Sequence, residues 1–134
     1  MTPFQLKIVT PDGIAYEGTA ESLTVRTTSG DIGIMAGHIN CVAPLGMGRA
    51  TIVTNGTQRY AACIGGMVSV LDGNVTLVPT TFEWAEDIDT QRAENAYNRA
   101  REILDNKASA QADLVLAEAR LKRALVRRSV ASSK

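Results

Sequence analysis

The hydrophobic period of this chain changes near Trp84, and the change divides its 134 residues into two parts that must fold differently. From Phe4 to about Pro79, apolar residues recur at every second position between turn residues such as Gly, Pro, Asn and Asp. This pattern is typical of half-buried strands joined by tight turns. From Ile88 onward glycine is absent, and the strong helix formers Ala, Glu, Arg, Leu and Gln dominate. The sequence therefore predicts an α+β chain, with a β unit over residues 1–84 and a helical unit over residues 85–134.

The β unit carries two sharp hairpin signals. Asn55-Gly56 and Asp72-Gly73 are residue pairs that tolerate the positive φ angles of type I′ turns, so each is expected to join two antiparallel strands. Strands at this spacing number about eight to ten, and stacking them in two layers leaves few exposed edges. We therefore predict an antiparallel β-sandwich.

The helical unit is expected to form an antiparallel two-helix hairpin. Asp89 is placed to cap the first helix with its carboxylate, and residues 105–107 interrupt the apolar pattern between the helices. The two stripes expected to face one another are Ala93, Ala96, Tyr97, Ala100, Ile103 and Leu104, and Ala110, Leu114, Ala117, Leu121, Ala124 and Leu125. Alanine removes little apolar surface from water, under about 1 kcal/mol for each methyl-sized group. The hairpin is therefore predicted to be weakly held.

Composition restricts the classes of function. Lys and Arg number 14 and Asp and Glu number 14, so the chain as a whole does not attract nucleic acid or anionic lipid. Cys41, Cys63 and His38 provide three soft ligands where structural zinc needs four, and we expect free thiols and no metal site. No apolar run approaches the ~18 residues of a membrane-spanning helix, and the start does not have the pattern of a signal peptide. Catalytic motifs such as a P-loop, a nucleophile elbow or paired carboxylates are absent from the sequence, which predicts a non-catalytic protein.

Three motifs resemble those of the epsilon-subunit family of F-type ATP synthases, and the resemblance extends over the whole chain. The run Gly30–His38, GDIGIMAGH, is similar to the family's G-(E/D)-x-G-I-(L/M)-x-x-H loop. Val9-Thr10-Pro11-Asp12 resembles the family's first turn, and Gly65–Val70 resembles its G-G-(F/V)-x-x-V strand start. The resemblance implies a non-catalytic central-stalk subunit that couples proton flow to ATP synthesis and inhibits ATP hydrolysis. It also implies a peripheral location on the cytoplasmic face of a bacterial inner membrane, reached only through the complex.

The partners that the resemblance implies are the gamma subunit, the c-subunit ring, and the alpha and beta subunits, with no nucleic acid. The loop residues expected at the gamma and c-ring interface are Asp31, Ile34, Met35 and His38. From spacing alone, the same run is also explained as a glycine-rich connection between strands.

A further segment, Ile88–Ala93, is similar to the family's (I/L)-D-x-x-R-A nucleotide motif. The resemblance implies ATP as a regulatory ligand, while no cofactor is required. Asp89 would accept from an adenine amino group or a ribose, and Arg92 would meet phosphate. The ATP-binding residues expected are Ile88, Asp89, Arg92, Ala93, Arg99, Arg123 and Arg127. The segment alone also fits a helix cap with a solvated ion pair.

The C-terminal end gathers basic residues on a chain without net charge. In the family, such residues meet an acidic segment of the catalytic beta subunits when the helices extend. The inhibitory contact would involve Arg120, Lys122, Arg123, Arg127 and Arg128. Two alternatives are a solvated helix face and a stand-alone nucleotide-sensing or nucleic-acid-binding module. The aromatic content of 4% disfavours a single-strand stacking platform.

Overall fold

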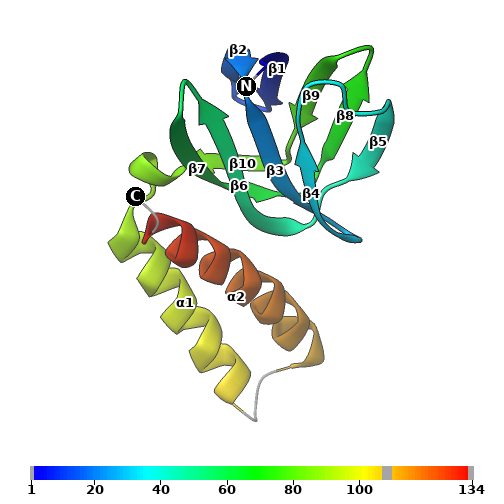
Figure 1. Ribbon diagram of the computed structural model, residues 1–134. Coiled ribbons are helices and arrows are strands. Elements are labelled where there is room, and N and C mark those ends of the chain that lie inside the picture. The colour runs from blue at the N-terminus through cyan, green and yellow to red at the C-terminus, as the bar shows by residue number, and fades with distance from the viewer. Residues whose placement is uncertain (1, 107–109, 133–134) are drawn as a thin grey trace.

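The computed structural model describes residues 2–106 and 110–132, in which two stacked sheets are followed by two α-helices (Figure 1). The first sheet contains, in spatial order, β2 (Gly13–Ala20), β1 (Phe4–Thr10), β9 (Asn74–Val78), β8 (Met67–Leu71) and β5 (Cys41–Pro44). The second sheet contains β10 (Thr81–Trp84), β7 (Thr57–Ile64), β6 (Met47–Thr54), β3 (Ser22–Thr27) and β4 (Gly30–Ile34). The predicted sandwich and helical hairpin are therefore confirmed.

Both hairpin turns form where the sequence indicates them. Asn55 and Asp72 have φ angles of 52° and 50°, and the glycine after each also has a positive φ. These turns make the β6–β7 and β8–β9 pairs antiparallel. One pairing differs from the predicted antiparallel sandwich, because β1 runs parallel to β9. The two strands are far apart in sequence, so no tight turn sets their relative direction.

The core of the sandwich is made entirely by the β unit. Its large buried side chains include Leu6, Ile8, Leu23, Ile52 and Leu77, each at most 2% exposed. Cys63 also lies in this core, and burial raises the pKa of its thiol to about 12, while Cys41 is half-buried and also free. Since no residue of the helices belongs to this cluster, the sandwich does not depend on the hairpin for its main apolar core.

Of the glycines in the sandwich, Gly66 has the least space for a side chain. Its φ is +91°, and a Cβ atom there would lie 2.0 Å from the carbonyl oxygen of Val78. We expect Gly66→Ala to lower the free energy of unfolding by about 2–4 kcal/mol, since backbone strain and the clash act together. Urea unfolding measures the loss. Gly33→Ala is the matched control, because a Cβ at Gly33 meets nothing within 4 Å. Equal midpoints for the two variants would contradict the assigned backbone geometry.

The helical unit begins with a short 3-10 helix, η1 (Ala85–Asp87), followed by α1 (Thr90–Asp105) and α2 (Gln111–Ala131). Asp89 caps α1 as predicted, since its Oδ1 accepts from the backbone N–H of Arg92 at 3.0 Å. The two α-helices lie side by side as a hairpin (Figure 1). Of the break predicted at residues 105–107, Asp105 is the last residue of α1 and Asn106 follows it as the C-cap. Lys107 and Lys134 lie outside the described residues.

Alanines form the contact between the two helices. Ala93, Ala100, Ala117 and Ala124 are buried, which agrees with the predicted stripes. Ala110 and Leu125 were assigned to the same stripe and are exposed instead. Leu125 follows Ala124 by one position, and a helix turns by about 100° per residue, so both cannot face α1.

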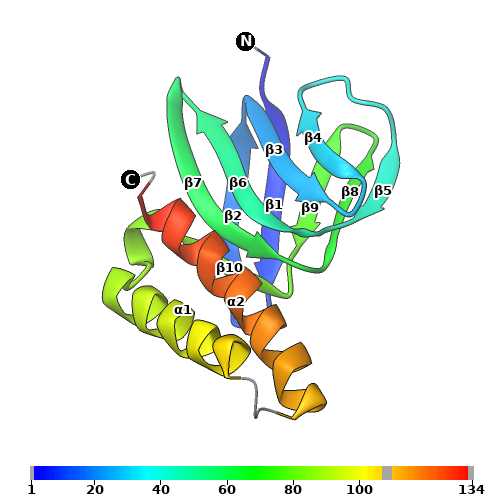
Figure 2. The same ribbon diagram turned by 90° about the horizontal axis from the view of Figure 1, so that it is seen from below.

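The hairpin is docked against the sandwich through α2, which contacts β6 and β7 (Figure 2). A small apolar cluster, here called the latch cluster, joins the two units. It consists of Ala62, Ala85, Ile88, Ala93, Val130 and Ala131, with Tyr60 and Val126 packed at its margin. Only Ile88 and Val130 are large buried members, and full burial of such a side chain stabilises by about 1.5–3 kcal/mol. The docked arrangement is therefore held by few apolar contacts.

Among the described residues, no helix has the length and hydropathy needed to cross a membrane.

Candidate functional site

A cavity of about 470 Å³ lies between α1 and α2, and arginines dominate its lining. We call it the arginine cavity. Its lining residues are Thr81, Arg92, Ala96, Arg99, Ala100, Ile103, Arg120, Arg123, Ala124 and Arg127. The helical repeat explains how the arginines come together. Arg92 and Arg99 are seven residues apart and so share one face of α1, as Arg120 and Arg127 do on α2. Antiparallel packing then places these two faces opposite each other.

The lining of the arginine cavity has a strong net positive charge. Its lining contains five guanidinium groups and no carboxylate. Arg127 lies 3.6 Å from Glu83, measured from Nε to Oε1, at the margin of the cavity. In residues 2–106 and 110–132, no ion pair joins Arg92, Arg99, Arg120 or Arg123 to an acidic side chain. Guanidinium groups donate in a planar fork that matches phosphate oxygens, so the cavity is suited to a polyanion.

A smaller cavity of about 180 Å³ adjoins the arginine cavity, and the two share Arg92 and Arg127. We call it the acidic cavity. Its lining residues are Glu83, Asp87, Ile88, Asp89, Arg92, Ala93 and Arg127. Carboxylates accept hydrogen bonds from amino and hydroxyl groups. The two cavities together therefore match a ligand with phosphates at one end and hydrogen-bond donors at the other.

One unsatisfied atom supports a ligand at the junction of the cavities. The buried Nε–H of Arg127 makes no hydrogen bond within the described residues, and its nearest acceptor is the ion-paired Glu83 carboxylate at 3.6 Å, so a closer acceptor would still improve its pairing. Buried donors are almost always paired in folded proteins, and an orphaned one calls for an explanation. An anionic ligand spanning both cavities would provide the acceptor.

The seven residues predicted for nucleotide binding all come together around these cavities. Ile88, Asp89 and Ala93 line the acidic cavity, Arg99 and Arg123 line the arginine cavity, and Arg92 and Arg127 line both. The prediction missed Thr81, Glu83 and Asp87 as lining residues, because they lie in β10 and η1 and do not share the period of the two α-helices. Arg120, named above for the inhibitory contact, also lines the arginine cavity, because its spacing of three and seven from Arg123 and Arg127 places it on the same face.

The loop predicted to contact partners is largely accessible. Asp31 and Met35 are exposed and His38 is half-buried, while Asp31 forms an ion pair with Arg26 at 3.1 Å. Ile34 is different, since its side chain is fully buried in the sandwich core. Side chains alternate along a strand, and Ile34 lies on the inward face of β4. Ile34 therefore supports the loop from inside and offers no surface to a partner.

The basic residues of α2 do not form one continuous outer face. Arg120, Arg123 and Arg127 line the arginine cavity. Arg128 is held against α1, where it lies 3.4 Å from Glu94 and stacks over the ring of Tyr97. Lys122 pairs with Glu118 on the exposed side. In the docked hairpin, most of this charge is therefore directed toward α1.

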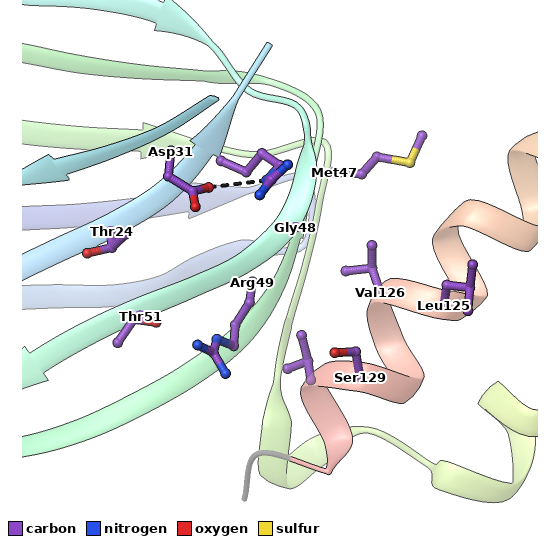
Figure 3. A pocket seen from close by; sticks show the side chains of 11 residues that line it. Thr24, Asp31, Met47, Gly48, Arg49, Thr51, Leu125, Val126 and Ser129 are labelled. Atoms are coloured by element: carbon purple, nitrogen blue, oxygen red, sulfur yellow. Dashed lines mark hydrogen bonds and ion pairs between the residues drawn. The ribbon is translucent and has the colours of Figure 1, made fainter. Parts of the chain in front are cut away.

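A second space, a groove of about 520 Å³, separates α2 from β3, β4 and β6 (Figure 3). Met47 lies on the strand side of this groove, and Leu125 and Val126 lie on the helix side. Its arginines are already engaged, because Arg26 pairs with Asp31 and Arg49 stacks on Tyr60 at 4.8 Å. The groove therefore lacks the concentrated charge of the arginine cavity, which is the stronger candidate site.

Comparison with known proteins gives matches over both units. Residues 3–85 match the family model described as the beta-sandwich domain of the ATP synthase delta/epsilon chain, and residues 86–132 match that of its long alpha-helix domain. The ATP synthase epsilon chain of Shouchella clausii is 40% identical over 134 residues, which cover 100% of this chain and 98% of that one. The ATP synthase epsilon chain of Bacillus cytotoxicus is 41% identical over 134 residues, with full coverage of both chains.

Solved structures with the same fold are more distant in sequence. A chain of the Euglena gracilis mitochondrial ATP synthase superimposes with a TM-score of 0.85 at 22% identity, covering 100% of this chain and 83% of that one. A chain of the Tetrahymena thermophila mitochondrial ATP synthase central stalk and c-ring gives a TM-score of 0.66 at 13% identity, covering 95% of both chains. At these identities the superpositions establish the fold.

Proposed function

The chain belongs to the epsilon-chain family of F-type ATP synthases, a family of non-catalytic subunits, and from this membership we propose that it is the nucleotide-sensing regulator of its complex. The sandwich binds the gamma subunit and the c-subunit ring as part of the central stalk, and so helps to couple proton flow to ATP synthesis. The hairpin restrains ATP hydrolysis at the alpha and beta subunits. The chain reaches the cytoplasmic face of a bacterial inner membrane only through these partners.

The contact with gamma and the c-ring is proposed for the loop that includes Asp31, Met35 and His38. Two exposed apolar side chains support this placement, since Met35 is 55% exposed and the neighbouring Ile39 is 76% exposed. Exposed apolar groups next to a charged residue are suited to a protein interface. Ile34 contributes only by holding the loop in place from the core.

ATP is the proposed regulatory ligand, and one observation carries this proposal. Five arginines converge on one cavity, which opens beside a second cavity lined by three carboxylates. The phosphates of ATP would lie among Arg92, Arg99, Arg120, Arg123 and Arg127. The amino and hydroxyl groups of the nucleoside would donate to the carboxylates of the acidic cavity.

Binding would favour the docked hairpin, because the two cavities need α1 and α2 packed together and lying beside Thr81 and Glu83 of β10. Ligand present at 100 times its dissociation constant stabilises the binding state by about 2.7 kcal/mol. That magnitude is comparable to the burial of one large member of the latch cluster. The ATP concentration can therefore decide whether the hairpin is docked.

Opening of the hairpin would release the same arginines for the inhibitory contact. Arg120, Arg123 and Arg127 line the arginine cavity when docked, and Arg128 is held by Glu94. About 45 helical residues would span roughly 65 Å, enough to reach a distant subunit. The freed arginines, with Lys122, would then meet an acidic segment of a beta subunit. ATP binding and inhibition thus compete for one set of side chains.

Calorimetric titration of the full chain with ATP tests the ligand. We expect binding by the wild-type chain, and Arg99→Gln should weaken it about tenfold or more, since a charged hydrogen bond contributes about 1.5–3 kcal/mol. Arg101→Gln is the matched control, because Arg101 is exposed on α1 and does not line either cavity. Absence of heat with the wild type, or equal weakening in both variants, would remove ATP from the account.

The alternative of a stand-alone nucleic-acid-binding module gains no support from these observations. Both units match models of one ATP synthase chain, and three basic residues of α2 face α1 rather than an open surface.

A further inference from the structure

We propose that the arginine cavity is a polyphosphate site in its own right, which takes inorganic tripolyphosphate without any nucleoside and thereby favours the docked hairpin. The proposal deepens the proposed function, since it concerns the same cavity and the same two states of the hairpin. It goes beyond ATP because it assigns a second class of ligand, the linear inorganic phosphates.

Positive and negative side chains are concentrated in different cavities. The arginine cavity has five guanidinium groups and no carboxylate, whereas the acidic cavity has Glu83, Asp87 and Asp89. A phosphate chain is attracted by the arginines of the first lining and repelled by the three carboxylates of the second. The two linings share Arg92 and Arg127, but the carboxylates that would hold a nucleoside lie only in the acidic cavity, and Arg99, Arg120 and Arg123 lie only in the arginine cavity. A ligand without a nucleoside loses only the acidic-cavity contacts.

The docked hairpin also leaves the positive charge of the arginine cavity largely without acidic partners. Arg127 has Glu83 nearby, but within the described ranges no acidic partner lies within ion-pair distance of the other four arginines of the cavity. Docking brings these like charges together between two helices, and their repulsion opposes the packed state. A compact polyanion removes that repulsion and makes charge-assisted hydrogen bonds with the guanidinium forks. Neither effect requires adenine or ribose.

Size supports an anion of this length. The cavity volume of about 470 Å³ falls within the range of small-molecule sites, roughly 300–1,000 Å³. A single phosphate would reach only some of the arginines, because they are distributed over two turns on each helix. A linear triphosphate presents more oxygens along a greater length, so it can accept hydrogen bonds from more of the guanidinium groups.

The consequence is a broader regulatory signal. Inorganic polyphosphate and ATP would compete for the arginine cavity, and either would favour the docked, permissive hairpin. The hairpin would then respond to the pool of free phosphate chains as well as to ATP.

Titration calorimetry of the full chain with inorganic tripolyphosphate at constant ionic strength tests the proposal. We expect saturable binding by the wild type and competition with ATP. Arg123→Gln, which alters only the arginine cavity, should weaken both ligands about tenfold or more. Asp87→Asn, which alters only the acidic cavity, should weaken ATP and leave tripolyphosphate binding unchanged or tighter. Arg101→Gln should change neither ligand.

The outcomes separate this proposal from the proposed function. Binding of ATP without binding of tripolyphosphate overturns the polyphosphate site and leaves ATP sensing intact. Binding of tripolyphosphate without ATP supports the polyphosphate site and removes ATP sensing. Equal weakening by Arg101→Gln and Arg123→Gln overturns the polyphosphate site, since it indicates nonspecific attraction to the positive surface. Absence of binding by both ligands overturns both proposals.

Discussion

Deletion of residues 89–134 is expected to raise the rate of ATP hydrolysis by the assembled synthase several-fold at low ATP, while the complex still assembles. The hairpin is the proposed inhibitory element, and it can be removed because the sandwich core contains none of its residues. The deletion uncovers Tyr60 and Ala62 of β7 together with Ala85 and Ile88, which is a small apolar surface. Steady-state hydrolysis by purified complexes measures the effect.

The dependence on ATP provides the control for this deletion. At high ATP the hairpin of the intact chain is docked, so intact and truncated complexes should hydrolyse ATP at similar rates. At low ATP the intact complex should be slower. If the two complexes hydrolyse ATP equally at every concentration, the hairpin has no inhibitory role.

Replacement of Val130 by aspartate is expected to undock the hairpin. Val130 is 1% exposed in the latch cluster. An unpaired carboxylate there would cost several kcal/mol, which exceeds what so small a cluster provides. Val115→Asp is the matched control, because Val115 lies on the same helix and is 61% exposed.

Spin labels on the two units measure the docking of these variants. Thr57 on β7 and Ala112 on α2 are both exposed and can be replaced by labelled cysteines, with Cys41 and Cys63 replaced by Ser and Ala. Val130→Asp should give a shifted and broadened distance distribution, whereas Val115→Asp should resemble the parent. Urea unfolding of the sandwich should change little in either variant. A docked distance in Val130→Asp would mean that the latch cluster does not hold the hairpin.

Much of this fold could be predicted because local patterns determine it. The loss of glycine after Gly73 and the change of period near Trp84 indicate the two units. Asn55-Gly56 and Asp72-Gly73 specify turns whose backbone angles few other residues adopt. The parallel β1–β9 pair was not predicted, because long-range pairing leaves no signature in a local period.

Part of the candidate site could also be predicted from the sequence, and part could not. The arginines of α1 and α2 were predicted from the resemblance of Ile88–Ala93 to the family's nucleotide motif, and their helical spacing explains how hairpin packing brings them together. Glu83 and Asp87 come from β10 and η1, so their approach depends on how the hairpin docks. That docking uses Val126, Val130 and Ala131, which the stripe facing α1 does not include. A single sequence pattern indicates that α2 has an apolar face, but not that a second face contacts β6 and β7.

The most direct test of ATP-dependent docking is the distance between the labels at positions 57 and 112, measured during titration with ATP in the chain that otherwise carries only the Cys41 and Cys63 replacements. ATP should increase the fraction of molecules at the docked distance, and Arg99→Gln should shift this increase to higher ATP concentrations. A distance distribution that is identical at zero and saturating ATP, with ATP demonstrably bound, would contradict ATP-dependent docking.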